Sequence, residues 1–319
     1  MAASSIGRAL LLVGSAILLG AAVQEGKPSQ KEISRELARM AAEDQQDQKE
    51  WVDDSRSDHF SRRQAERAAR VNEIVAAGQL ASLEDWQNAC WLLQHGNTPD
   101  DYLLAHVLSV PPGAKGLPFA GFASAATLDR FLQSIQRPQI FLTQSGSGDP
   151  AVFAPLEPFD DSLPESIRKA YRLDPLKRAR KEERAGKTPS PRELARLLKA
   201  AAPASLPTPA TEPAPEWLVR AREIVAAGAL KSEEDHALAA RVLLRSAAVD
   251  DLLLAHVLAT AASLLGHDEG LPLTAETLDR FLLACGQPQR FGTVLEASSS
   301  LLHENLRRPY GLGPRGKER

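Results

Sequence analysis

The stretch TLDRFLQSIQRPQIFLT at residues 127–143 returns as TLDRFLLACGQPQRFGT at residues 277–293. At a constant offset of 150 residues, the whole of 70–143 aligns with 220–293 without a gap, and roughly 33 of 74 positions are identical. A match of this length and density indicates an internal duplication. The fold is therefore predicted to be built twice within one chain.

The duplication extends upstream of these segments. RELAR occurs at residues 35–39 and again at 192–196, an offset of 157. Each unit is thus far longer than the roughly 20–50 residues of a solenoid repeat. Since the chain of 319 residues has room for two domains, we expect two tandem homologous domains, copy 1 and copy 2.

Apolar periodicity predicts an all-α fold. Residues 33–47 and 62–77 carry apolar side chains at helical spacing, and Gly78 and Gly228 fall where helices would stop. Residues 83–95 form another expected helix, and the next begins at residues 99–101, with an aspartate as N-cap. Strand-like residues occur only in the short IFLT after Pro138.

The domain boundaries follow from composition. The basic run 177–184 precedes an alanine- and proline-rich stretch that is typical of an extended linker. Within it, Ser190, Pro191 and Glu193 form a capping-box pattern that predicts a helix from Pro191 to about Ala201. We expect a signal peptide at 1–23, copy 1 at 29–176, a connector at 177–215 with its helix near 191–201, and copy 2 at 216–316.

The N-terminal sequence MAASSIGRALLLVGSAILLGAAVQ predicts an export leader. One cation, Arg8, precedes an uncharged apolar run from Ala9 to Val23 that ends in small residues. A run of about 15 residues suits a signal peptide and is short of the ~20 that span a bilayer. We expect a periplasmic or secreted protein with no other transmembrane segment; the alternative is an uncleaved leader that tethers the chain to the inner membrane.

Charge and cysteine content narrow the function classes. The 38 basic and 41 acidic side chains nearly cancel, so nucleic-acid binding is not expected. Cys90 and Cys285 occupy non-matching positions in the duplication, which leaves open two unpaired cysteines or one bridge between the copies. No CxxC pattern, P-loop, GxSxG or dinucleotide fingerprint occurs, and neither a metal nor another cofactor is expected.

The order of short motifs resembles a known family. RELARMAAEDQ, EIVAAG, ACWLLQHGNTPDD, TLDRFL, RPQIFLTQ and LPESIRKAYRL follow one another in copy 1. In this order they resemble the bacterial domain of unknown function 6624 family, and the resemblance covers most of both copies. No activity, cofactor or partner is implied by it. Copy 1 departs from the family pattern at Gly96, Asn97 and Leu142.

The two copies keep different parts of this pattern. Copy 1 carries the polar motif residues Asp44, Gln45, Gln94, His95, Asp129, Arg130, Gln139, Thr143 and Gln144. Copy 2 retains Asp279, Arg280, Gln289 and Thr293, but Leu244 and Arg245 replace the glutamine and histidine, and Val294 replaces Gln144. A polar site built from the motif is therefore expected in copy 1 and is degenerate in copy 2.

The motif residues allow a ligand site or a structural role. A histidine beside an aspartate is the pattern of an oriented general base, which makes His95 and Asp129 the catalytic candidates. Arginine and glutamine amides suit a carboxylate, phosphate or sugar. The candidate ligand-binding residues are Gln94, His95, Arg130, Gln139, Thr143, Gln144, Arg280 and Gln289. The alternative is that these groups satisfy backbone at chain turns.

His106 and His256 are the matched histidines of the two LLAHVL segments. They lie on apolar helix faces, so we interpret them as buried core residues.

Taken together, the sequence predicts an exported tandem helical protein that binds an envelope protein or polymer without catalysis. The alternative is an envelope hydrolase or transferase with its site in copy 1 around His95.

Overall fold

Matched sequence forms matched helices. The computed structural model describes residues 28–50, 57–117, 119–146, 154–175, 191–200, 214–294 and 302–313. Its helices are α1 (Gln30–Glu50), α2 (Ser57–Ala76), α3 (Leu83–Leu93), α4 (Pro99–Ala114), α5 (Ala120–Ser134), α6 (Glu165–Ala170), α7 (Pro191–Ala200), α8 (Glu216–Ala226), α9 (Glu233–Leu243), α10 (Val249–Leu265), α11 (Gly270–Ala284) and α12 (Glu304–Arg307), followed by the 3₁₀ turn η2 (Arg308–Tyr310).

The expected all-α class is confirmed. Within the described ranges no strand forms, and the only β contacts are the isolated bridges Gln139–Phe159 and Ser145–Pro155. The strand-like IFLT segment is thus part of a turn, because Asp129 binds its backbone N–H groups and no neighbouring strand is present to pair with them.

We call residues 30–175 the N-terminal half and 191–313 the C-terminal half. At the offset of 150, the bounds of α3 and α5 coincide with those of α9 and α11, and α4 is one residue shorter than α10 at its C-terminal end. The expected connector helix, α7, is not a free spacer: Leu194 and Leu197 are buried, and the helix packs against α8 and α9.

Local capping chemistry fixes where these helices begin. Ser82 and Asp85 form a capping box at α3, and Ser232 and Asp235 form the same box at α9. At α4 the expectation of an aspartate N-cap is wrong. Thr98 is the N-cap, because Pro99 takes the first helical position, and an aspartate three residues after the cap completes the box.

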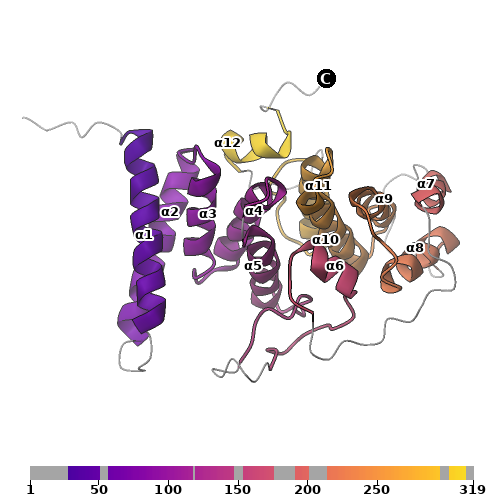
Figure 1. The fold of residues 1–319 in the computed structure, drawn as a ribbon, viewed down its shortest axis with the longest axis horizontal. Coiled ribbons are helices and arrows are strands. Elements are labelled where there is room, and N and C mark those ends of the chain that lie inside the picture. Colours follow the sequence, from indigo (N-terminus) through magenta and orange to yellow (C-terminus); the bar gives the residue numbers. More distant parts are fainter. Residues whose placement is uncertain are drawn as a thin grey trace, which may run out of the picture.

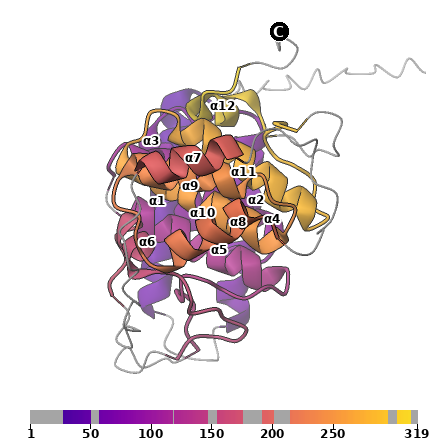
Figure 2. The ribbon, with the colours of Figure 1, turned by 90° about the vertical axis from the view of Figure 1, so that its right-hand side faces the viewer.

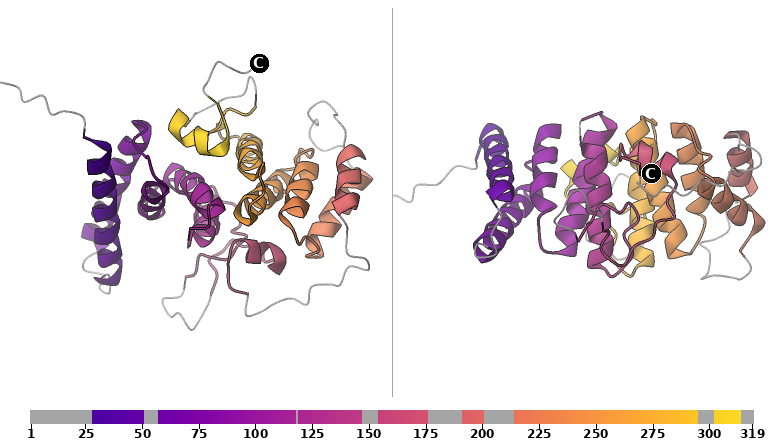
Figure 3. Two further views of the ribbon diagram at one scale, coloured as in Figure 1. Left: turned by 45° about the horizontal axis from the view of Figure 1, so that its top comes forward. Right: turned by 60° about the horizontal axis from the view of Figure 1, so that its bottom comes forward.

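The helices of both halves lie side by side in a row, with α1 at one end and α7 at the other (Figure 1). The end-on view shows α7 lying over α9 (Figure 2), and the rotated views keep α1 and α7 at opposite ends (Figure 3). At the centre of the row, α4 contacts α10 and α11. The buried apolar residues of both halves form one continuous core.

Two histidines meet where the halves join. His106 and His256 are fully buried, and their Nε2 atoms lie 2.9 Å apart. His106 Nδ1 lies 2.9 Å from the carbonyl oxygen of Ser124, which only accepts, so this nitrogen donates. A neutral His106 then accepts at Nε2, and His256 must donate. The contact is consistent with two neutral rings in one defined tautomer each.

Two tyrosines cross between the halves. Tyr171 donates to the carbonyl oxygen of Val257 at 2.9 Å, and Tyr310 donates to that of Val107 at 2.7 Å. Both tyrosines are buried, and the two valines are matched positions. Each half therefore ends in a segment that is anchored on the central helix of the other half.

These end segments also match one another. Residues 163–173 and 302–312 align at an offset of 139, and in both the arginine of the segment donates to a phenylalanine carbonyl oxygen: Arg168 to Phe141 and Arg307 to Phe291. The match is not visible at the offset of 150, because the segment before it is 11 residues shorter in the C-terminal half.

The turn after α5 generates a stability prediction. Gln136 has φ 61° and is exposed, whereas the matched residue after α11 is Gly286 with φ 72°. A left-handed backbone costs a non-glycine residue about 1–2 kcal/mol. We expect Gln136→Gly to raise the free energy of unfolding by about 0.5–1 kcal/mol and Gly286→Gln to lower it, measured by urea denaturation. Equal and small effects of both changes would contradict this account.

We expect the buried pair His106 and His256 to make the folded protein less stable in acid. Burial lowers the pKa of His106 from 6.5 to about 4, and burial together with the neighbouring His106 lowers that of His256. Histidines in the unfolded chain bind protons near pH 6.5. The contribution of the buried pair to the free energy of unfolding is therefore fully present above that pH and is lost as the pH falls towards 4. His106 alone accounts for on the order of 3 kcal/mol.

Urea titrations at pH 7, 5.5 and 4.5 would measure this loss. The double variant His106→Gln, His256→Gln should lose less stability between pH 7 and 4.5 than the unmodified protein does. Parallel pH profiles for the two proteins would show that the histidine pair is not the acid-sensitive group.

Candidate functional site

Part of the candidate site lies on turns of α1 and α2 that have no counterpart in the C-terminal half. The ion pair Glu36–Arg70 recurs as Glu193–Arg220, which aligns α1 with α7 and α2 with α8. Helix α1 continues for 14 residues beyond Glu36, whereas α7 ends at Ala200. The additional turns of α1, and those at the start of α2, carry a group of charged and amide side chains.

An aspartate–histidine pair joins α1 to the turn after α3. His95 Nδ1 lies 3.0 Å from Asp44 Oδ2; the aspartate is fully buried, and the histidine side chain is 18% exposed. With Nδ1 donating to the carboxylate, the neutral ring presents Nε2 as an acceptor. Asp44, a motif residue, and not the expected Asp129, is therefore the carboxylate that orients His95.

Further charges surround this pair. Arg67 approaches Asp44 Oδ1 at 3.5 Å and also pairs with Asp47, which in turn lies 2.8 Å from Arg63. Arg67 is 6% exposed, so the cluster is mostly shielded from water. Guanidinium and carboxylate groups that share partners in this way hold one another in fixed positions.

Some buried polar atoms in this cluster have no hydrogen-bond partner. They are Asp44 Oδ1, Arg67 Nη1 and both amide atoms of Gln64, a residue that is 2% exposed. Asp44 Oδ1 and Arg67 Nη1 face each other as the 3.5 Å ion pair, whereas each polar atom of the Gln64 amide lacks a partner at a cost of about 1–3 kcal/mol. A buried polar atom without a protein partner is a place where a water molecule or a ligand can bind, and such atoms also occur in the C-terminal half, at His236 Nε2 and Thr260 Oγ1.

A second link brings Arg130 to the same turn. Its Nε donates to Gln144 Oε1 at 2.9 Å, and its Nη1 donates to the carbonyl oxygen of Gln94, the residue before His95. Tyr102 is a further neighbour: burial raises the pKa of its phenol, and the Arg130 guanidinium partly lowers it. The QH, DR and TQ motifs thus meet in space, as a shared ligand site requires.

Other motif residues are used by the backbone. Asp129 is fully buried and accepts hydrogen bonds from the N–H groups of Ile140, Phe141 and Thr143 and from the Thr143 hydroxyl, at 2.7–3.0 Å. Burial raises the pKa of Asp129, and these four bonds oppose the rise. A carboxylate with this set of partners holds the turn and has no free oxygen for catalysis.

The C-terminal half forms the same arrangement, in which one buried aspartate accepts hydrogen bonds from three backbone N–H groups and a threonine hydroxyl; we call it the carboxylate cage. Asp279 accepts from the N–H groups of Arg290, Phe291 and Thr293 and from the Thr293 hydroxyl. The glutamines also match, since Gln139 bonds both backbone groups of Gln144 and Gln289 bonds both of Val294. Asp129, Gln139, Thr143 and Gln289 therefore have the structural role that the sequence left open.

The halves differ where the scaffold does not require the residue. Gln94, His95, Tyr102 and Gln144 are matched by Leu244, Arg245, Leu252 and Val294. Asp44 is matched by Ala201 at the offset of RELAR, and Arg67 by Trp217. Because the C-terminal half forms the helices that match α3, α4 and α5 without the polar groups of Gln94, His95 and Tyr102, these three helices do not need them. Asp47, Gln64, Arg67 and Tyr102 were missed as site residues, and only the contrast between the halves could have indicated them.

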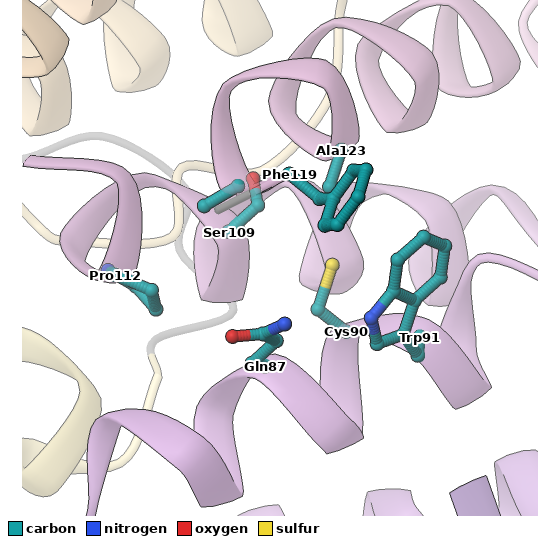
Figure 4. Close-up of a pocket in the computed structure, with 8 residues that line it drawn as sticks. Gln87, Cys90, Trp91, Ser109, Pro112, Phe119 and Ala123 are labelled. Carbon is teal, nitrogen blue, oxygen red and sulfur yellow. The ribbon is translucent and has the colours of Figure 1, made fainter. Parts of the chain in front are cut away.

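A small apolar pocket lies elsewhere in the N-terminal half. Cys90, Trp91 and Phe119 line it together with Gln87, Ser109, Pro112, Ala120 and Ala123 (Figure 4). Its free volume of about 10 Å³ is roughly the room for one water molecule. In the C-terminal half the positions of Trp91 and Phe119 hold the ion pair Arg241–Glu269.

The cysteines do not add chemistry to the site. Cys90 and Cys285 are both free, so the alternative of a bridge between the copies is wrong. Burial raises the pKa of Cys90 to about 12, which keeps it a thiol at neutral pH.

Among the described residues, no group of three or more histidine, cysteine or acidic side chains is placed to hold a metal ion. None of the described helices has the length and apolar content to cross a bilayer.

The carboxylate cage predicts large and equal mutational effects. We expect Asp129→Ala and Asp279→Ala each to lower the free energy of unfolding by about 3–5 kcal/mol, because several buried N–H groups lose their acceptor. Urea denaturation measures both. Asp47→Ala, in the unmatched part of α1, is the control and should cost less than either. A cost below about 1 kcal/mol for Asp129→Ala would exclude the structural role.

Comparisons of this chain with protein-family models, with curated proteins and with solved structures give no significant match.

Proposed function

We propose that the protein is a non-catalytic binding module with one ligand site, located around His95 in the N-terminal half. In this proposal the two halves are tandem homologous domains, and the second has kept the scaffold and lost the site. The chain is exported by its leader, residues 1–23, which lie outside the described residues. Its ligand is an envelope protein or polymer. The motif order further supports kinship with the domain of unknown function 6624 family.

The observation that carries the proposal is the contact between His95 and Asp44. Their 3.0 Å contact is part of a mostly buried polar cluster that includes unsatisfied atoms. The matched positions in the C-terminal half are Arg245 and Ala201, which cannot form the pair. Because the polar residues around His95 have no counterpart in the C-terminal half, we infer that they serve a ligand.

The C-terminal half then has a bracing role. Tyr310 anchors on Val107 and His256 meets His106, both on α4. The turn that bears His95 lies between α3 and α4, so contacts that fix α4 also fix one side of that turn. A rigid site reduces the ordering cost of binding.

Catalysis is the second candidate, and the same pair favours it. A histidine whose Nδ1 bonds a buried carboxylate presents Nε2 as a general base, the arrangement that activates a hydroxyl or water in hydrolases and transferases. His95 is partly exposed and so can meet a substrate. The substrate's own fate distinguishes the two candidates.

The test is a thermal-shift screen of envelope peptides and glycans with three proteins: the unmodified chain, His95→Asn, and the matched control Arg245→Asn. A ligand at 100 times its Kd stabilises the folded state by about 2.7 kcal/mol. We expect a ligand that stabilises the unmodified chain and Arg245→Asn but not His95→Asn.

Mass spectrometry of the recovered ligand then separates the candidates. An unchanged ligand supports binding, and a cleaved or transferred one supports catalysis. A ligand that stabilises all three proteins equally would place the site away from His95 and overturn both.

A further inference from the structure

Arg130 is a partly buried cation whose partners are neutral. Its Nε donates to the amide oxygen of Gln144, and its Nη1 donates to the carbonyl oxygen of Gln94. No described residue brings a carboxylate within ion-pair distance of it, and its other neighbour is the neutral phenol of Tyr102. The positive charge of Arg130 is therefore oriented but not neutralised.

The matched arginine shows that this is not a requirement of the fold. Arg280 occupies the same position on α11 and has Glu276 one turn earlier, with Nε 3.8 Å from Oε1. The residue that matches Glu276 in α5 is Ala126, which is buried and offers only its carbonyl oxygen to Gln144. The N-terminal half has thus an arginine at the matched position without the carboxylate that accompanies it in the C-terminal half.

A guanidinium group that is shielded from water is stabilised by an anion that accepts hydrogen bonds from two of its N–H groups. Arg130 is prepared for such a partner, because Gln94 and Gln144 fix the plane of its guanidinium before any ligand arrives. Two other groups near it can donate or accept hydrogen bonds: the Tyr102 hydroxyl, which interacts electrostatically with Arg130, and His95, the residue after Gln94. In the C-terminal half the matched residues are Leu252 and Arg245.

We propose that the ligand carries an oxyanion, a carboxylate or a phosphate group, and that Arg130 binds it. This inference rests on the proposed function, since it assigns the ligand class of the same site. His95 and Tyr102 contact the part of the ligand next to the anion. Arg280, paired with Glu276, binds no anion.

The test uses the Nε–Hε resonances of the arginines in ¹⁵N-labelled full-length protein. Inorganic phosphate and sodium acetate are titrated separately at constant ionic strength, so that the two oxyanions are compared under equal screening. We expect the Arg130 resonance to shift and saturate with at least one of the two anions, while that of Arg280 does not. The anion that saturates at the lower concentration identifies the preferred group.

Variants make the assignment specific. Arg130→Gln should weaken binding of that anion at least tenfold, and the matched control Arg280→Gln should leave it unchanged. Arg130→Lys, which keeps the charge but loses the planar fork, should bind more weakly than the unmodified protein; it replaces Arg130→Gln if the latter does not fold. Parallel, non-saturating shifts of both arginines, or unchanged affinity in both Arg130 variants, would overturn the inference.

Failure of this inference is distinguishable from failure of the proposed function. A neutral ligand that needs His95 but binds Arg130→Gln and the unmodified chain equally would remove the oxyanion and keep the site. Saturable phosphate or acetate binding at Arg130, with every ligand of the screen indifferent to His95→Asn, would keep the anion position and remove the role of His95.

Discussion

The packing of α4 against α10 is the constraint on which the rest of the structure depends. Two fully buried imidazoles meet there at 2.9 Å, and the second nitrogen of each ring faces a buried oxygen, the Ser124 carbonyl oxygen or the Thr277 hydroxyl oxygen. Burying such groups is favourable only when each finds its partner. Because the contact needs His106 and His256 in one register, and the tyrosine bonds to Val107 and Val257 need the same register, the interface specifies a single way for the halves to join.

The turn after α5 connects the helices to the candidate site. The Asp129 cage holds the turn after α5, and that turn presents Gln144 to Arg130. Arg130 in turn holds the carbonyl group next to His95. The Asp129 turn and the candidate site are therefore consecutive parts of one hydrogen-bond network. The motif residues that the sequence groups together divide into those that hold the turn and those of the candidate site.

The all-α class could be predicted from the sequence, because apolar periodicity acts locally, and the matched helix bounds follow from the sequence match between the halves. The shared bounds of α3 and α9 follow from their Ser–Asp capping boxes, and burial of His106 follows from the apolar face around it. That it would face His256 could not be predicted, since periodicity gives the buried side of a helix but not the helix that covers it. The match of 163–173 with 302–312 was hidden by the change of offset.

The arrangement of the candidate site residues could be predicted only in part. His95 and Arg130 were named from their motifs, and the need of Arg130 for partners from other segments follows from its place opposite the apolar arc of α5. The pairing of His95 with Asp44 depends on how α1 packs on α3, which no local pattern determines. Asp129 was misassigned because its spacing from the turn at residues 140–143 does not reveal that the backbone N–H groups converge on one carboxylate.

The crossing of the two C-terminal segments has a consequence for how such a protein can change. If the halves descend from a duplicated domain, a pair of identical subunits joined in this way would carry two equal sites, and any substitution in one would occur in both. Joined in one chain, the halves share the anchoring tyrosines but not their mutations. Leu244, Leu252 and Val294 could then replace polar residues in one half while Tyr171 remained bound to the backbone of α10. In a single chain, one half can therefore lose its polar residues while the contacts between the two halves are kept.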